Sequence, residues 1–234
     1  MRAVASSARK FVLAPWRAVE SQHIVATMPL VDSLDEQATL EKLLDESKPA
    51  MPAGVEGLHW LLFTPFRYPP PPGGSRFRGD YDPGVFYAAD SIETACAELG
   101  YWRWRHLLES PDMDHIPSRA QTVFQVSVRA QGIDLRDKPF ARSKAKWTHP
   151  SDYAACQKMA RAARTAGLGL LRYQSVRDPH QGGCVAVLSP AAFSGKEPIA
   201  TQTWHLAIFR ERVVWRSDDP LRPISLEFPA ARWS

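Results

Sequence analysis

The chain has few cysteines, and their spacing argues against two kinds of site. Only three are present among 234 residues, Cys96, Cys156 and Cys184, and no two form a C-x-x-C pair. An odd number of widely spaced cysteines supports neither a disulfide framework nor a cysteine-rich zinc site. The seven histidines form no H-E-x-x-H or comparable close pair, so no metal is expected. We therefore expect a protein of the reducing cytoplasm.

Long apolar runs and three well-known enzyme motifs are also missing. No apolar stretch approaches the roughly 20 residues that cross a bilayer, and Phe11 to Ala14 is too short for the core of a signal peptide. The chain lacks a G-x-G-x-x-G sequence after a strand, a G-x-x-x-x-G-K-[ST] loop and a G-x-S-x-G elbow. Rossmann dinucleotide sites, P-loops and α/β-hydrolases are therefore not supported.

The composition is that of an ordinary folded domain. Hydrophobic residues make up 44% and charged residues 23%, which argues against disorder or a coiled coil. The length predicts one large domain, or one domain with an N-terminal attachment. The net charge of +4 suits anionic small molecules as readily as nucleic acid.

The order of the predicted elements indicates an α+β fold. Helices are expected after the capping boxes at Ser33–Glu36 and Asp90–Glu93, the second over 92–108, and again over 152–165. The apolar run 58–66 predicts a buried strand, with a short buried helix as the alternative, and the prolines and glycines of 69–74 predict a loop. Further strands are expected at 85–88, 122–129, 170–176, 184–188, 203–209 and 213–215. Strands outnumber helices without regular alternation, which favours α+β over a doubly wound sheet.

A tryptophan and arginine cluster raises the possibility of nucleic-acid binding. Residues 102–106 read Trp-Arg-Trp-Arg-His, the residue types of a single-stranded nucleic-acid platform. On one helix the two tryptophans project about 200° apart, so they cannot form one stacking surface. Core packing with solvated arginines is the favoured interpretation.

Four further segments stand out together. They contain Arg67, then Arg76 in a Gly-Ser-Arg-Phe sequence, then Tyr87 with Glu98 eleven residues later, and finally Ser175 before the glycine pair 182–183. Taken singly, these residues are surface charges, a strand tyrosine, a charge on the flank of a helix and a turn hydroxyl. Their order and spacing are more specific than any one of them.

In that order the series resembles the RES family. Arg76 matches the glycine-rich arginine motif, Tyr87 the strand tyrosine, Glu98 the helix glutamate and Ser175 the late serine, while Arg67 corresponds to the arginine of the family's first strand. The resemblance covers roughly residues 58 to 215. It leads us to expect an N-terminal helical extension over 1–52 and a catalytic domain over 53–234. Cys184 departs from the polar residue, often asparagine, expected after the paired glycines.

The resemblance implies an ADP-ribosyltransferase-like fold acting on NAD, which is consumed as a substrate rather than kept as a cofactor. It also implies the toxin half of a bacterial toxin–antitoxin pair, with an Xre-like antitoxin that blocks the active site. Nucleic acid would then be reached only through the antitoxin, and no membrane is involved.

The residue chemistry agrees with that expectation. Guanidinium groups such as Arg67 and Arg76 bind phosphate oxygens through paired hydrogen bonds. A carboxylate such as Glu98 stabilises the oxocarbenium character that develops when the bond between nicotinamide and ribose breaks. A tyrosine ring offers the nicotinamide an aromatic surface and a serine hydroxyl can bond the ribose or amide, the roles expected of Tyr87 and Ser175.

Three functions remain open from the sequence. The first is an NAD glycohydrolase or phosphorylase that passes ADP-ribose to water or phosphate. The second is an ADP-ribosyltransferase with a protein acceptor, which the sequence does not separate from the first. The third is a non-catalytic nucleotide- or nucleic-acid-binding module. It ranks lower because such a module is expected to have lost the glutamate or an arginine, and both residue types are present at the named positions. Oligomeric state is not indicated.

Overall fold

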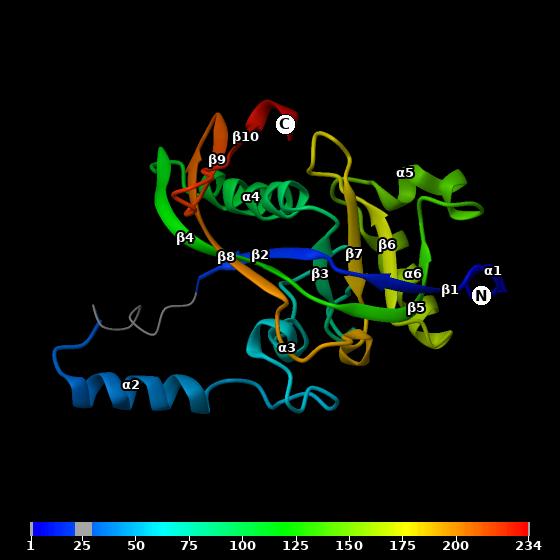
Figure 1. Cartoon of the computed structure of the whole chain (residues 1–234), viewed down its shortest axis with the longest axis horizontal. Helices are drawn as coiled ribbons and strands as arrows, with labels where there is room; N and C mark the ends of the chain where they lie inside the picture. Colours follow the sequence, from blue (N-terminus) through cyan, green and yellow to red (C-terminus); the bar gives the residue numbers. More distant parts are fainter. Residues whose placement is uncertain (1, 22–29, 234) are drawn as a thin grey trace.

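A ten-stranded mixed sheet forms the centre of the structure (Figure 1), which is a computed structural model describing residues 2–21 and 30–233. The strand order is β1-β5-β6-β7-β3-β2-β4-β8-β9-β10, and every neighbouring pair is antiparallel except β5 and β6. The expected α+β class is confirmed. The strands are β1 (Arg9–Leu13), β2 (Trp16–Glu20), β3 (Phe86–Ala89), β4 (His115–Gln125), β5 (Val128–Asp134), β6 (Leu170–Gln174), β7 (Gly183–Val187), β8 (Ala200–Phe209), β9 (Arg212–Ser217) and β10 (Ser225–Pro229).

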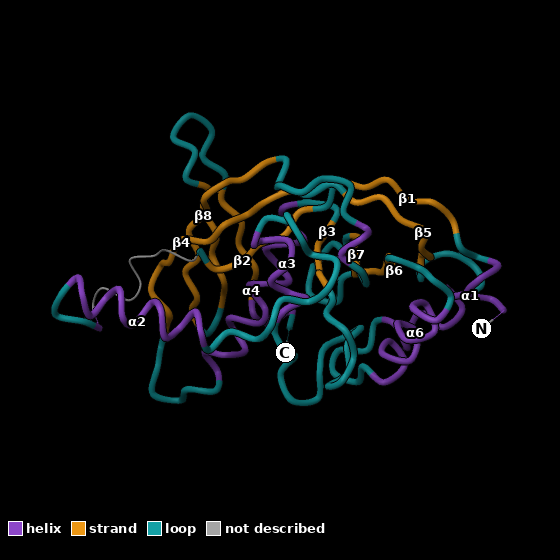
Figure 2. The backbone as a smooth tube through the Cα atoms, turned by 90° about the horizontal axis from the view of Figure 1, so that it is seen from below, coloured by secondary structure: helices purple, strands orange, loops and turns teal. Residues whose placement is uncertain are grey.

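Helices cover both faces of this sheet, as Figures 1 and 2 show. Because side chains alternate along a strand, β7 sends Cys184 and Ala186 to one core and Val185 and Val187 to the other. Helix α4 packs on the first face and α3 on the second. The helices are α1 (Arg2–Ser6), α2 (Leu34–Glu46), α3 (Trp60–Arg67), α4 (Ile92–Leu108), α5 (Lys144–Trp147) and α6 (Ala154–Thr165), with short 3₁₀ turns that include η3 (Pro190–Ala192) and η4 (Ala230–Arg232).

The N-terminal segment differs from the expected helical extension. Strand β1 pairs with β5 at one edge of the sheet, and β2 lies between β3 and β4 in its interior. Five β2 residues from Trp16 to Glu20 face partners on β4 from Gln125 to Gln121. The segment before residue 22 is therefore part of the same sheet, and α1 and α2 are the only α-helices in the described part of 1–52. Two short strands separated by Pro15 have no long periodic pattern that would reveal them in the sequence.

The apolar run at 58–66 forms helix α3, so the expectation of a strand was wrong and the helical alternative holds. His59 caps the helix, with its Nδ1 accepting a hydrogen bond from the Leu61 N–H at 3.2 Å. Leu62 and Phe66 lie four positions apart and both are buried, the spacing that places them on one helical face. A continuous apolar run contains no period, so burial on one helix face and burial in a strand give the same sequence signal.

The other predicted helices are confirmed with small changes at their ends. Helix α4 spans the expected 92–108, but its N-cap is Ser91 rather than Asp90, because the Ser91 Oγ accepts from the Thr94 N–H. Helix α6 ends before Gly167, which adopts φ +72°, the left-handed conformation that glycine permits at a helix end. The strand expected at 122–129 is in fact the end of β4 and the start of β5.

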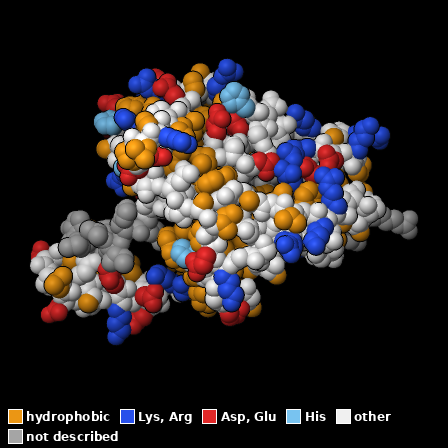
Figure 3. Space-filling model, in the orientation of Figure 1, with side chains coloured by type: hydrophobic (Ala, Val, Ile, Leu, Met, Phe, Trp, Pro, Cys, Tyr) orange, Lys and Arg blue, Asp and Glu red, His pale blue; other side chains and the backbone are white. Residues whose placement is uncertain are grey.

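Helix α2 stands away from the rest of the chain. Ser33 caps it as expected, accepting from the Glu36 N–H, while Glu36 in turn accepts from the Asp32 N–H. None of its residues is buried, and Leu43 and Leu44 are exposed. The space-filling view shows it as a separate lobe with charged side chains on its visible face (Figure 3).

Because β2 lies inside the sheet, deleting residues 1–21 should abolish the cooperative thermal transition seen by circular dichroism. The deletion exposes the edges of β3 and β4 and removes the buried apolar surface of both β1 and β2. As a control, Leu43→Ser combined with Leu44→Ser on α2 should shift Tm by only a few degrees, since both side chains are exposed. A shortened chain that still unfolds cooperatively would mean that the sheet does not need its N-terminal strands.

Candidate functional site

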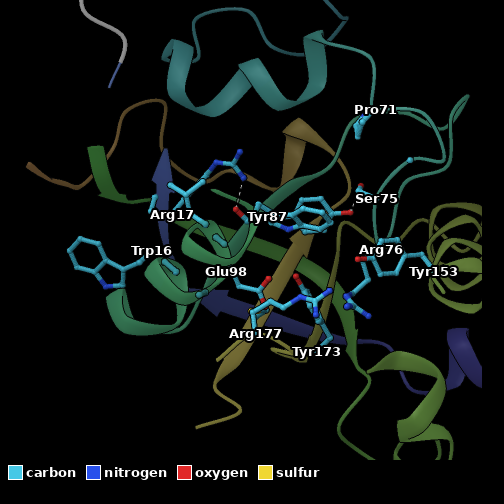
Figure 4. A pocket seen from close by; sticks show the side chains of 18 residues that line it. Trp16, Arg17, Pro71, Ser75, Arg76, Tyr87, Glu98, Tyr153, Tyr173 and Arg177 are labelled. Atoms are coloured by element: carbon cyan, nitrogen blue, oxygen red, sulfur yellow. Dashed lines mark hydrogen bonds between the residues drawn. The ribbon is translucent and has the colours of Figure 1, made fainter. Parts of the chain in front are cut away.

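A cavity of about 300 Å³ opens on the α4 face of the sheet, and several elements converge on it (Figure 4). Strands β2 and β3, helix α4, the loop 71–76 and the segment that follows β6 all contribute side chains. The lining residues are Trp16, Arg17, Ala18, Pro71, Gly74, Ser75, Arg76, Tyr87, Ala88, Ala89, Ala95, Glu98, Leu99, Trp102, Tyr153, Tyr173, Arg177 and Cys184.

The charges in this lining are strongly unbalanced. The lining contains three arginines, Arg17, Arg76 and Arg177, and a single carboxylate, Glu98, which together give it a net charge of +2. In the view of Figure 4, Arg76 and Tyr153 lie on one side of Glu98, whereas the Arg17 side chain points away from Glu98 toward the Tyr87 carbonyl oxygen. Tyrosine and tryptophan rings supply much of the remaining surface. Such a cavity attracts an anionic ligand that also carries flat rings.

Glu98 is held by Ser175, the late serine that the sequence singled out. The buried Ser175 Oγ donates to Glu98 Oε1 at 2.5 Å and accepts from the Arg177 and Asp178 N–H groups at 3.2 and 3.0 Å. A serine hydroxyl that bonds backbone two and three residues onward forms a tight local turn. The sequence therefore brings Ser175 to Glu98 rather than directly to the cavity surface.

Cys184 lies beside the same carboxylate oxygen. Its Sγ is 3.9 Å from Glu98 Oε1, and burial, followed by the nearby Glu98 charge, raises the pKa of the thiol well above its usual value. Cys184 is therefore a neutral thiol in the cavity wall. The Ser175 and Cys184 contacts both use Oε1, so Oε2 is the oxygen that Glu98 can offer to a ligand.

Tyr87 lines the cavity with its ring and uses its hydroxyl to hold the arginine loop. The hydroxyl shares a hydrogen bond with Ser75 Oγ at 2.8 Å and accepts from the Phe77 N–H at 2.9 Å. Burial raises the pKa of Tyr87 to about 12. The loop also needs Gly74, which has φ +77° and whose Cβ, if present, would lie 2.1 Å from the Arg78 carbonyl oxygen.

Arg76 reaches the cavity from that loop. Its Nη1 donates to the carbonyl oxygens of Trp147 and His149 at 3.0 and 2.9 Å, and its guanidinium lies 4.8 Å from the centre of the Tyr153 ring. Both hydrogen bonds go to neutral backbone oxygens. Over the ranges that the structure describes, no carboxylate pairs with Arg76, so its positive charge is oriented by backbone oxygens without being neutralised.

Arg17 is a cavity residue that the sequence analysis missed. The ladder between β2 and β3 consists of one residue pair, Trp16 with Ala89, and beside it the Arg17 Nη1 donates to the Tyr87 carbonyl oxygen at 2.6 Å. The guanidinium also lies 4.9 Å from the Phe86 ring centre. Burial lowers the pKa of Arg17 to about 10, so it is still a cation at neutral pH. The feature of the sequence that could have indicated it is an arginine within the short run Trp-Arg-Ala-Val-Glu at 16–20.

Arg67, by contrast, is not brought to this cavity. It occupies the last turn of α3, on the other face of the sheet, and its Nε donates to the Pro49 carbonyl oxygen at 2.6 Å. The expected correspondence assumed that 58–66 was a strand. With that run helical, the strand arginine that lines the cavity is Arg17, although its guanidinium lies over Phe86, whose ring packs on the α3 side of the sheet.

Arg177 is a second missed residue, although its segment was noted. It is 6% exposed, its guanidinium lies 3.6 Å from the Tyr101 ring centre, and its Nη2 donates to the Pro150 carbonyl oxygen at 2.5 Å. The signal was the sequence Ser-Val-Arg that begins at Ser175. A turn that points Ser175 at Glu98 also places Arg177 at the cavity.

The tryptophans of 102–104 separate as expected. Trp104 is 6% exposed, whereas Trp102 is 51% exposed and lines the cavity. They form no common stacking surface.

Among residues 2–21 and 30–233, no group of three or more histidine, cysteine, aspartate or glutamate side chains is placed to hold a metal ion. No helix within those same ranges has the length and apolar character needed to cross a membrane.

Comparison with known proteins identifies the family. Residues 51–208 match the model of the RES domain, so the chain belongs to the RES domain family, as its motifs indicated. A search of curated proteins found no match. Among solved structures, the chain is similar to one described as the crystal structure of the M. tuberculosis MbcT–MbcA toxin–antitoxin complex. The identity is 13%, the TM-score 0.49, and the alignment covers 83% of this chain and 85% of that one.

Replacing Ser175 by alanine should lower the free energy of unfolding by about 1–3 kcal/mol, measured by urea denaturation. The change leaves the Arg177 and Asp178 N–H groups without their acceptor in a buried turn, which costs the desolvation of those groups. A matched control is Ser189→Ala, whose Oγ accepts one bond from the Ala191 N–H in an exposed segment. Equal losses in the two variants would contradict the role given to the Ser175 turn.

Proposed function

We propose that this RES-domain chain cleaves NAD at the bond between nicotinamide and ribose, and that it is the toxin of a toxin–antitoxin pair. The observation that carries the first part is the cavity with three arginines, one carboxylate and several aromatic rings. The pyrophosphate of NAD bears two negative charges, which the net charge of +2 offsets. Its two bases are flat rings of the kind that tyrosine and tryptophan faces accept.

Glu98 would act on the ribose. When the bond from the ribose C1′ to the nicotinamide nitrogen breaks, its electron pair leaves with that nitrogen and the pyridinium becomes neutral nicotinamide. Positive charge then develops at C1′ and the ring oxygen, and the Glu98 carboxylate stabilises it. Ser175 would fix the carboxylate through Oε1. Oxygen from water or phosphate then bonds to C1′ and releases its proton to the solvent.

The arginines would bind the rest of the dinucleotide. Arg17 and Arg76 are each oriented by backbone carbonyl oxygens, so their remaining N–H groups are pre-positioned for phosphate oxygens. Tyr87 would place its ring against the nicotinamide, with its hydroxyl already engaged by the loop. NAD is the substrate here, and no resident cofactor is proposed.

The toxin role rests on membership of the RES domain family. Consumption of NAD in the cytoplasm would stop growth, and a cognate antitoxin of Xre type would prevent it by covering the cavity. Because the cavity is cationic, the covering segment should carry an acidic group or a chain terminus. Contact with nucleic acid would come only through that antitoxin.

Glu98→Gln should reduce kcat for NAD cleavage by at least about 100-fold while changing KM by no more than about threefold. The substitution keeps the shape and removes a charge needed mainly in the transition state. Products would be identified by mass, with and without phosphate, using Glu109→Gln on the exposed end of α4 as the matched control. In bacteria, the wild-type chain should lower NAD and arrest growth, and Glu98→Gln should do neither.

Each result of that experiment has a defined meaning. ADP-ribose or its phosphate ester identifies water or phosphate as the acceptor, and mass added to a protein identifies a transferase. Growth arrest with normal NAD in Glu98→Gln cells would refute NAD depletion as the cause of arrest. Wild-type turnover by Glu98→Gln would refute the role of the carboxylate.

Arg17→Ala and Arg76→Ala should each raise KM for NAD by roughly 10-fold or more, whereas Arg67→Ala should leave it unchanged. The first two lose charge-assisted hydrogen bonds to phosphate, and Arg67 does not line the cavity. Steady-state kinetics would measure this, with circular dichroism to confirm folding. If only Arg67→Ala raised KM, Arg67 would be a substrate-binding residue and the phosphate-binding roles proposed for Arg17 and Arg76 would be wrong.

A further inference from the structure

An aromatic cluster near the C-terminus lies against the cavity wall. Trp233 follows the 3₁₀ turn η4, and its ring lies 5.6 Å from both the Tyr101 and Trp104 rings and 6.2 Å from Phe228. The Tyr101 contact is nearly perpendicular, at 85°, a favoured geometry for aromatic pairs. The cluster therefore joins η4 and β10 to the buried face of α4.

This cluster contacts both the backbone and the side chain of Arg177. The Trp233 Nε1–H donates to the Arg177 carbonyl oxygen at 2.7 Å, and the guanidinium of the same residue lies 3.6 Å from the Tyr101 ring centre. The Trp233 and Tyr101 rings also contact each other. Backbone and side chain of Arg177 are thus fixed by one connected group of rings.

The position of Arg177 matters because it is nearly buried and lines the cavity. Within the described residues, no carboxylate oxygen lies within 4.0 Å of its guanidinium, which contacts the Pro150 carbonyl oxygen and the Tyr101 ring. A buried cation with neutral partners is stabilised by a ligand that brings negative charge. Small shifts of its backbone would move its N–H groups away from that ligand.

We propose that Trp233 is a positioning residue for the anion-binding part of the cavity and that it acts through Arg177. The inference rests on the proposed function, and it adds that residues beyond the family match at 51–208 complete the site. Arg177 binds phosphate oxygens of the dinucleotide. The Trp233 hydrogen bond keeps the Arg177 carbonyl, and with it the turn at 175–178, in the binding geometry.

A packing role alone would give different results from a positioning role. Trp104 provides the comparison, since it belongs to the same ring cluster and its Nε1–H also donates to a backbone carbonyl, that of Arg210 at 2.9 Å. Trp104→Phe and Trp233→Phe therefore remove the same chemical group and keep a ring. They differ in whether the freed carbonyl belongs to a cavity residue.

The experiment measures NAD kinetics in Trp233→Phe, Trp104→Phe, Arg177→Ala and the Trp233→Phe/Arg177→Ala double variant. Trp233→Phe should raise KM about fivefold, the effect of one hydrogen bond, with kcat within about twofold and a Tm equal to that of Trp104→Phe. Arg177→Ala should raise KM by roughly 10-fold or more. In that background Trp233→Phe should add less than about twofold, because residues that act through one another are not additive.

A second measurement needs no ligand. In the free protein, hydrogen exchange in peptides covering 173–181 should be faster in Trp233→Phe than in the wild type and unchanged in Trp104→Phe. Equal exchange in the two variants would overturn the proposal, as would a Trp233→Phe effect on KM that persists in full without Arg177. If the wild-type chain does not cleave NAD, the proposed function fails, and the exchange pattern still decides whether Trp233 positions Arg177.

Discussion

Three guanidinium groups share one small cavity with a single carboxylate, and the surrounding structure supports each of them in the same way. Arg17 lies near the Phe86 ring and bonds the Tyr87 carbonyl, Arg76 lies near Tyr153 and bonds two carbonyls, and Arg177 lies on Tyr101 and bonds Pro150. Rings and carbonyl dipoles stabilise a cation without cancelling its charge. The cavity therefore keeps its attraction for an anion, which a set of salt bridges would have removed.

The single carboxylate, Glu98, is held by a side-chain hydroxyl rather than by rings and backbone carbonyl groups. Glu98 projects from the flank of α4, where the helical pattern of the sequence placed it, and its Oε1 is occupied by Ser175. The order of motifs carried the resemblance to the RES family, which predicted that Arg76, Tyr87 and Glu98 belong to one site, and all three line the cavity. It also predicted that Ser175 belongs with them, although not that its partner is Glu98.

The remaining parts of the site depend on contacts that sequence patterns do not encode. Arg17 lies on a five-residue strand that is stabilised by its neighbours in the sheet and shows only a weak pattern of its own. Arg67 was assigned to the site through its resemblance to the arginine of the family's first strand, and an apolar run alone does not separate a buried strand from a buried helix. Arg177 was visible in the sequence, but its importance comes from its burial against Tyr101, which is far away in the chain.

The cavity also has a consequence for how the chain folds. Its three cations come from positions 17, 76 and 177, and their supporting rings and strands come from nearly the whole length of the chain. Contacts between residues so far apart in sequence form slowly, because closing the long loop between them costs conformational entropy before the contact contributes any favourable free energy. On the ribosome, β2 would leave the exit tunnel long before β6 and β7, and the nascent chain would hold an incomplete cavity until most of the protein had emerged. The cavity would thus be complete only at the end of synthesis.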